Sequence, residues 1–143
     1  MATKQEVVEF LKKIDKDFPV PISSKVDLDE YAKKILDRAT LMIRRDNNAI
    51  IGMVVGYNNC ICDDMAYISL VGVDLEYRNK GIAKTLIKRF IADCKEKGIG
   101  KVHLYTDSTN VGAIRMYEKL GFKPYVQYNE PRPEDVHLIY CDD

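Results

Sequence analysis

The sequence of 143 residues lacks tryptophan, has only two histidines and contains no long apolar run. Its longest apolar stretches, such as residues 49–55 (AIIGMVV), fall well short of the roughly 20 residues that a membrane-spanning helix needs. The N-terminal stretch MATKQEVVEFLKK carries charges throughout and lacks the apolar centre of a signal peptide. We therefore expect no membrane association and a cytoplasmic location.

An excess of charge of either sign is also absent. The 22 basic and 22 acidic residues cancel, which excludes the basic surface expected of a general nucleic-acid-binding protein. A hydrophobic content of 46% and a charged content of 31% are ordinary for a soluble globular protein. Because the length suits one folded unit with a sizeable core, we predict a single domain over residues 1–143.

Cysteines are few and poorly spaced for metal binding. Cys60 and Cys62 stand one residue apart, without a second Cys/His pair at zinc-finger spacing. Cys94 lies within a helical pattern and Cys141 is near the end of the sequence. We expect reduced thiols and no metal site, and keep a metal or redox role as the alternative.

The hydrophobic pattern predicts a mixed α/β (α+β) chain. Apolar residues three and four positions apart predict helices over residues 5–17, 27–38, 81–97 and 111–120, with Asp27 as an N-cap. β-Branched and apolar runs predict strands over residues 40–45, 49–57, 66–74, 101–107, 124–130 and 135–141. In this order only the central strand–helix–strand unit forms a parallel crossover. The prediction is a mixed, mostly antiparallel sheet with helices on both faces.

A charged loop leads directly into the clearest helical pattern, at residues 78–83 (RNKGIA). A helix N-terminus exposes about four unpaired N–H groups and roughly half a positive charge, which favours phosphate. Gly81 lets an anion approach the backbone, Ala83 is small, and Arg78 and Lys80 add positive charge. The loop predicts a pyrophosphate site of neither the dinucleotide nor the Walker type. A plain surface turn is the alternative interpretation.

Two motifs together resemble the GNAT superfamily of acetyl-CoA-dependent N-acetyltransferases. The loop at residues 78–83 is similar to the Arg/Gln-x-x-Gly-x-Gly/Ala motif that holds the CoA pyrophosphate in that family. A second segment follows the family pattern Asn-x-x-Ala-x-x-x-Tyr-x-x-x-Gly-Phe through Asn110, Ala113, Tyr117, Gly121 and Phe122. The resemblance covers about residues 40–125. The family usually opens with a strand, whereas this chain opens with a helical pattern, so the strand count stays open.

The resemblance implies acetyl-CoA as co-substrate and a set of site residues. Tyr117 is the expected catalytic residue, an acid that protonates the departing CoA thiolate. A strand bulge in the family implies that Val71, Gly72 and Val73 pair with the pantetheine arm; the alternative is that Gly72 merely packs under a helix. The implied cofactor contacts are Val71, Gly72, Val73, Arg78, Asn79, Lys80, Gly81, Ile82, Ala83, Asn110 and Ala113.

The general base is left open. The strand over residues 66–74 lacks the glutamate that the family often supplies there. Asp63, Asp64 and Tyr67 are the nearby candidates, directly or through a water molecule. We expect the two histidines, His103 and His137, to be core residues rather than bases.

The implied function is direct acetyl transfer to the primary amine of a small molecule, with an amino sugar among the acceptors considered. We expect the acceptor site to be built by the first two helices and by residues 58–65 and 126–134. The second interpretation is a non-catalytic acyl-CoA-binding module of the same fold. Whether the protein is a monomer or a homodimer is left open.

Overall fold

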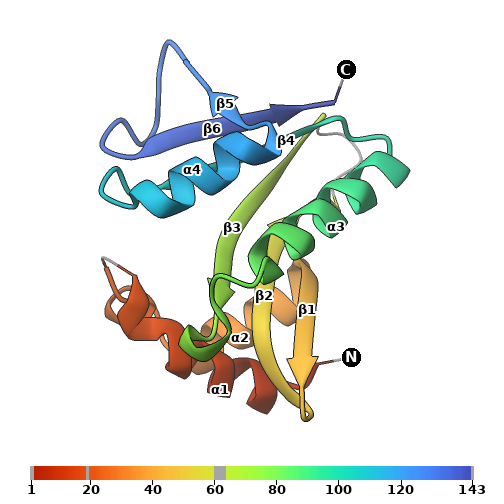
Figure 1. The fold of residues 1–143 in the computed structure, drawn as a ribbon, viewed down its shortest axis with the longest axis vertical. Helices are drawn as coiled ribbons and strands as arrows, with labels where there is room; N and C mark the ends of the chain where they lie inside the picture. The colour runs from red at the N-terminus through yellow and green to blue at the C-terminus, as the bar shows by residue number, and fades with distance from the viewer. Residues whose placement is uncertain (1, 19, 60–63, 143) are drawn as a thin grey trace.

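A computed structural model describes residues 2–18, 20–59 and 64–142, and the structural statements below concern these residues. Figure 1 shows the elements in the order α1 (Lys4–Ile14), α2 (Leu28–Arg38), β1 (Thr40–Asp46), β2 (Ala49–Tyr57), β3 (Met65–Val73), α3 (Ile82–Glu96), β4 (Lys101–Thr106), α4 (Val111–Leu120), β5 (Lys123–Pro124) and β6 (Val136–Cys141). Three short 3₁₀ turns, η1 (Asp15–Asp17), η2 (Ile22–Ser24) and η3 (Leu75–Tyr77), lie between them.

The described strands form a six-stranded sheet in the order β1-β2-β3-β4-β6-β5. Strands β3 and β4 pair in parallel and the other neighbours are antiparallel. The predicted mixed sheet with a central parallel crossover is therefore confirmed. No strand precedes α1 in the described part of the chain.

Helices cover both faces of the sheet, as predicted. On one face α1 and α2 enclose a core that includes Phe10, Ile35 and Met53. On the other face α3 and α4 enclose a larger core built around Phe90 and Phe122. No described helix is long and apolar enough to cross a membrane. The single domain and the cytoplasmic location stay predictions.

Local sequence signals fix most element ends. Asp27 caps α2 as predicted, because its carboxylate accepts a hydrogen bond from the Asp29 N–H at 2.9 Å. Asn47 and Asn48 take positive φ values of 50° and 68°, so the hairpin turns where it was expected. The first helix ends at Ile14, earlier than predicted. The chain tightens there into η1, where Asp15 accepts a hydrogen bond from the Ser23 N–H at 2.9 Å.

The predicted strand over residues 124–130 is mostly wrong. Its pairing with β6 stops at Pro124, opposite Leu138, and residues 126–130 form no strand. Val126 and Tyr128 are 89% and 100% exposed. The alternating apolar side chains of this segment imitate a strand, but no core faces them.

Candidate active site

Strands β3 and β4 part midway along the sheet. They pair only from Met65–Ile68 and Lys101–Leu104, whereas β3 continues to Val73 and β4 to Thr106. The Asp74 N–H donates to the Ile51 carbonyl on β2 at 2.8 Å. Since backbone groups alternate along a strand, the N–H groups of Val71 and Val73 point to the other side, into the gap beside β4.

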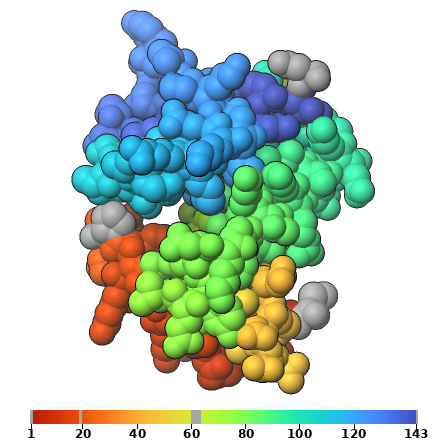
Figure 2. All heavy atoms as spheres, in the orientation of Figure 1, coloured from red at the N-terminus to blue at the C-terminus, as the bar shows by residue number. Residues whose placement is uncertain are grey.

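A groove of about 820 Å³ passes through this gap and joins the two faces of the sheet. Figure 2 shows its hollow between α4, drawn in cyan and blue, and the red segment that follows α1. On the α3 and α4 face it is bordered by Arg78, Asn79, Gly81, Ile82, Ala83, Asn110, Ala113 and Tyr117. On the α1 and α2 face it is bordered by Val20, Lys25, Tyr31, Ser69, Tyr105 and Arg132.

The predicted phosphate loop forms a left-handed turn before α3. Asn79 and Gly81 have φ values of 64° and 77°, and α3 begins at Ile82. A Cβ built on Gly81 meets no heavy atom within 4 Å, so a β-branched side chain there would enter open space beside the groove. The first N–H groups of α3 have no intrahelical partner. The turn therefore fits a phosphate group held by backbone N–H groups.

Arg78 and Lys80 flank this turn in different ways. The Arg78 guanidinium borders the groove, donates from Nε to the Val73 carbonyl at 3.1 Å and pairs with Asp17. Lys80 does not border the groove, and its Nζ lies 5.5 Å from the centre of the Tyr77 ring. The geometry therefore brings Arg78, but not Lys80, to the predicted cofactor site.

Helix α4 brings Asn110 and Tyr117 to the same wall of the groove. Asn110 caps the helix, since its Oδ1 accepts from the Ala113 N–H at 3.3 Å. Tyr117 follows two turns later and is only 6% exposed. Burial raises the pKa of its phenol, so the hydroxyl stays protonated and able to donate.

Gly72 lies against α1, and the strand bulge lies at Ser69. The pairing of β3 with β2 is interrupted at Ser69, because Val55 faces Leu70 and Gly56 faces Ile68. A Cβ on Gly72 would lie 2.4 Å from Ile14 Cδ1 on α1. The bulge lies three residues earlier than expected, and a side chain at residue 72 would require Ile14 on α1 to shift.

A chain of hydrogen bonds leads away from Tyr105, which borders the other end of the groove. The Glu130 carboxylate accepts from the Tyr105 hydroxyl at 2.6 Å and lies 2.7 Å from His137 Nδ1. His137 Nε2 lies 2.8 Å from His103 Nδ1. The hydrogen bond from Tyr105, with smaller effects of His137 and Arg132, lowers the pKa of Glu130 to about 2. The carboxylate is ionised at neutral pH, so His137 Nδ1 carries the proton between them.

Burial also shifts the pKa values of Tyr105 and His103. Burial, followed by the hydrogen bond to Glu130, raises the pKa of Tyr105 to about 12. Burial lowers the pKa of His103, with a smaller effect of His137. His137 is 7% exposed and His103 is half-buried, and neither histidine borders the groove.

The proposed bases do not gather at the groove. The side chain of Asp64 is 86% exposed, and Tyr67 packs on His103 at 5.0 Å between ring centres; neither borders the groove. Asp63 lies outside the described residues, as do Cys60 and Cys62. The described parts of residues 58–65 do not reach the groove either.

Several groove residues were missed by the sequence-based prediction: Asp17, Lys25, Tyr31, Tyr105, Arg132 and Asp135. Asp17, Tyr31 and Arg132 lie in segments that were assigned to the acceptor wall, which were the first two helices and residues 58–65 and 126–134, whereas Lys25, Tyr105 and Asp135 lie outside them. Nothing in the local sequence distinguishes these residues from ordinary surface tyrosines and charges. Their role in the site depends on contacts across the sheet.

Two relatives in sequence illustrate the similarity. Over 70 residues the chain is 36% identical to a mycothiol acetyltransferase from Nocardiopsis dassonvillei, covering 47% of this chain and 21% of that protein. Over 56 residues it is 43% identical to N-alpha-acetyltransferase 30 from Xenopus laevis, covering 39% of this chain and 20% of that protein. The chain thus spans about a fifth of each relative.

Solved structures show the same fold over nearly the whole chain. An acetyltransferase of the GNAT family from Staphylococcus aureus Mu50 superposes with a TM-score of 0.77 at 22% identity, covering 96% of this chain and 92% of that one. The PaiA N-acetyltransferase of Thermoplasma acidophilum, in complex with coenzyme A, gives 0.74 at 17% identity over 96% and 92%. The model of the acetyltransferase (GNAT) family matches residues 7–122, and the chain belongs to this family.

Proposed function

We propose that the protein transfers the acetyl group of acetyl-CoA to the primary amine of a small molecule by direct attack. One observation carries the proposal: the groove between β3 and β4 connects the turn at Gly81 on one face of the sheet to Tyr31 and Tyr105 on the other. A co-substrate and an acceptor that enter from opposite faces would meet at the parted strands.

The cofactor half of the groove suits acetyl-CoA, which the GNAT family uses. The N–H groups at the start of α3 would hold the pyrophosphate, with Arg78, Asn79, Gly81, Ile82 and Ala83 around it. In this proposal Asn110 and Ala113 line the opposite wall. Lys80 contributes only positive charge nearby.

The exposed edge of β3 would hold the pantetheine arm. The N–H groups of Val71 and Val73 point into the gap, so they can pair with the amides of an extended ligand like an added strand. The Gly72 backbone borders the same gap. One of these N–H groups would polarise the thioester carbonyl and stabilise the oxyanion that forms on attack.

Tyr117 supplies the acid and water suffices as the base. Bound acetyl-CoA supplies the activated acetyl group, and the departing sulfur takes a proton from the Tyr117 hydroxyl. Deprotonating an amine whose pKa is about three units above neutral costs roughly 4 kcal/mol. This modest cost agrees with a groove whose three carboxylates among the described residues are already engaged: Asp17 and Asp135 pair with arginines, and Asp107 accepts hydrogen bonds from Thr109.

The acceptor half of the groove, on the α1 and α2 face, is consistent with a small acceptor. Its walls include residues 20–26, Tyr31, Tyr105 and Arg132, which come from separate segments. The relatives named above include enzymes for both small-molecule and protein amines, so an amine panel decides between them. The cytoplasmic location and the number of copies stay predictions.

Release of free CoA thiol from acetyl-CoA tests the function. The panel contains amino sugars, polyamines, amino acids and short peptides with free N-termini. We expect release that depends on the amine, together with acetylation of the amine seen by mass spectrometry. Binding of acetyl-CoA without release for any amine would instead indicate a non-catalytic acyl-CoA-binding module.

A further inference from the structure

Arg132 is held unusually firmly for an arginine on a loop. Its Nε and Nη2 both donate to Asp135 Oδ2, at 2.9 and 2.6 Å. Its backbone N–H donates to Glu130 at 3.1 Å, and its guanidinium lies 4.5 Å from the centre of the Tyr105 ring. A side chain as flexible as arginine loses much rotamer freedom when it is fixed, and here it is already fixed in the free protein.

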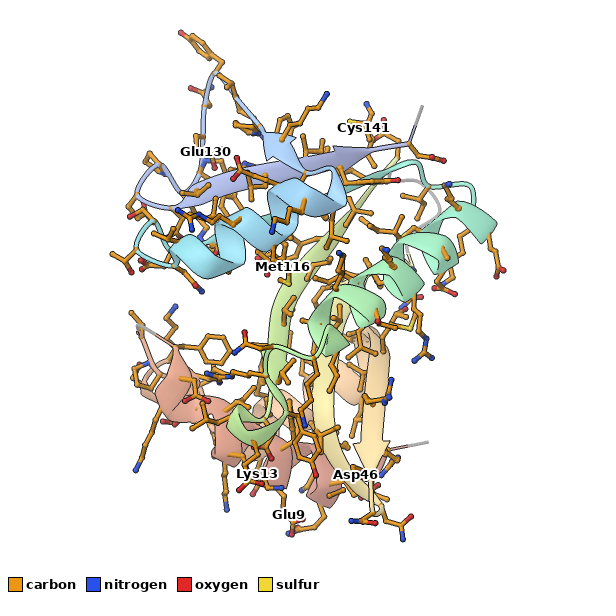
Figure 3. All side chains as sticks on the ribbon, in the orientation of Figure 1. Glu9, Lys13, Asp46, Met116, Glu130 and Cys141 are labelled. Atoms are coloured by element: carbon orange, nitrogen blue, oxygen red, sulfur yellow. The ribbon has the colours of Figure 1, made fainter. Side chains whose placement is uncertain are left out.

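The support of Arg132 extends into the sheet. Tyr105, on which the guanidinium lies, also stacks on the His137 ring with 4.0 Å between centres and an angle of 21°. Glu130 joins Tyr105, His137 and the Arg132 backbone through its two carboxylate oxygens. Figure 3 shows Glu130 on the loop that leads into β6, above the sheet. The loop therefore holds its arginine in one place at the edge of the groove.

The fixed guanidinium keeps donors for a ligand. Arginine has five N–H donors in a planar fork, and the contacts to Asp135 use two of them. Lys25, from the connection between η2 and α2, borders the same groove, and its ammonium makes no ion pair within the described residues. A planar, bidentate anion such as a carboxylate is the group that a pre-organised guanidinium binds best.

We infer that Arg132 binds a carboxylate of the acceptor, with Lys25 adding positive charge. The acceptors are then amines that carry a carboxylate, either free amino acids or short peptides with an acidic group. This inference rests on the proposed function and narrows its substrate class. Glu130 and Tyr105 are positioning residues here, because they act on the acceptor through Arg132.

Matched pairs of acceptors test the inference. Each pair contains one amine with a carboxylate and the same amine with that group as a carboxamide: glycine, β-alanine and 4-aminobutyrate, and a short peptide with Asp or Asn at its second position. For at least one pair we expect kcat/KM to be about 10- to 100-fold higher for the acid, the range of a charged hydrogen bond. The free and peptide pairs separate the two sources of the carboxylate.

Variants of Arg132 test whether its guanidinium causes the preference for an acid over its amide. Arg132→Met should lower the acid-to-amide ratio of kcat/KM about 10- to 100-fold, and Arg132→Lys should lower it less, because lysine loses the planar fork. Arg115→Met is the matched control, since Arg115 is exposed on α4 and does not border the groove. Melting curves of each variant confirm that it folds.

The outcomes separate the two proposals. If no amine releases CoA thiol, the proposed function fails. If amines are acetylated but no acid is preferred over its amide, the function stands and the carboxylate site is wrong. An acid preference that survives both Arg132→Met and Lys25→Met also overturns the carboxylate site.

Discussion

The two halves of the groove are built in different ways. The chemistry of the cofactor half is carried mainly by two short motifs, residues 78–83 before α3 and Asn110 to Tyr117 on α4, with the edge of β3 between them. The acceptor half is assembled from segments far apart, with Tyr31, Tyr105 and Arg132 on three of them. A local motif can carry the chemistry that related enzymes share, whereas the acceptor wall can vary without disturbing it.

The largest expected effect tests whether Tyr117 serves every acceptor. Tyr117→Phe keeps the ring in the core and removes the hydroxyl, so kcat should fall about 10- to 300-fold. This is the lower end of the range for a positioned acid, because the CoA thiol is already a fair leaving group. Steady-state kinetics with several amines measures it. Acetyl-CoA affinity and melting temperature should change little.

Tyr105→Phe provides the contrast from the acceptor half. It removes the hydrogen bond to Glu130 and should change the KM for the acceptor more than kcat.

Wild-type turnover in Tyr117→Phe would contradict the acid role of Tyr117. It would make Tyr117 a packing residue and leave water to protonate the thiolate.

The next effect concerns which nucleotide the cofactor half accepts. At about 100 times its Kd, a ligand that binds only the native state adds about 2.7 kcal/mol to the free energy of unfolding. CoA should raise the melting temperature, whereas NAD and ATP at equal concentration should do little. A larger shift with NAD than with CoA would show that the turn before α3 binds another ligand.

Gly81→Val tests the turn itself. The added branches would occupy the open space beside the α3 N-terminus, so affinity for acetyl-CoA should fall at least tenfold, about 1.4 kcal/mol. Gly98 is the matched control, because it has φ of 81° against 77° for Gly81 and an equally open Cβ direction. Gly81→Val and the control Gly98→Val should lose stability to a similar extent.

Calorimetry decides the outcome for this pair. Only Gly81→Val should lose affinity for CoA. An equal affinity in a folded Gly81→Val variant would remove the phosphate site from the proposal.

The smallest effect concerns pH and the acceptor half. The hydrogen bonds to Glu130 lower its pKa from an ordinary 4.5 to about 2. A carboxyl group with a lowered pKa stabilises the fold above its unfolded pKa, and this contribution is lost as pH falls between about 4.5 and about 2. Wild type should therefore lose more melting temperature between pH 5 and pH 3 than Glu130→Gln.

Glu134→Gln, on the same loop, is the control for this experiment, because the exposed Glu134 makes no ion pair with the described residues. It should follow the wild-type pH curve. A Glu130→Gln variant with the same pH dependence as wild type would contradict the anchoring of the loop by Glu130.

The sequence by itself determined the features that depend on near neighbours. Asp27 capped α2 and the asparagine pair turned the hairpin, because a cap or a tight turn involves residues only a few positions apart. The spacing of seven residues between Asn110 and Tyr117 placed both on one wall of the groove for the same reason. The element order and the mixed sheet also followed from hydrophobic periodicity.

The tertiary structure alone decided what depends on distant partners. In the folded chain the bulge lies at Ser69, Lys80 does not border the groove, and residues 126–130 form no strand. The walls of the groove depend on distant pairs such as Tyr105 with Glu130 in the acceptor half and Arg78 with Asp17 in the cofactor half, which are 25 and 61 positions apart. A hydrophobic pattern says which face of an element is buried, but not which polar side chain from another segment meets it, because that depends on how the strands and loops pack in space.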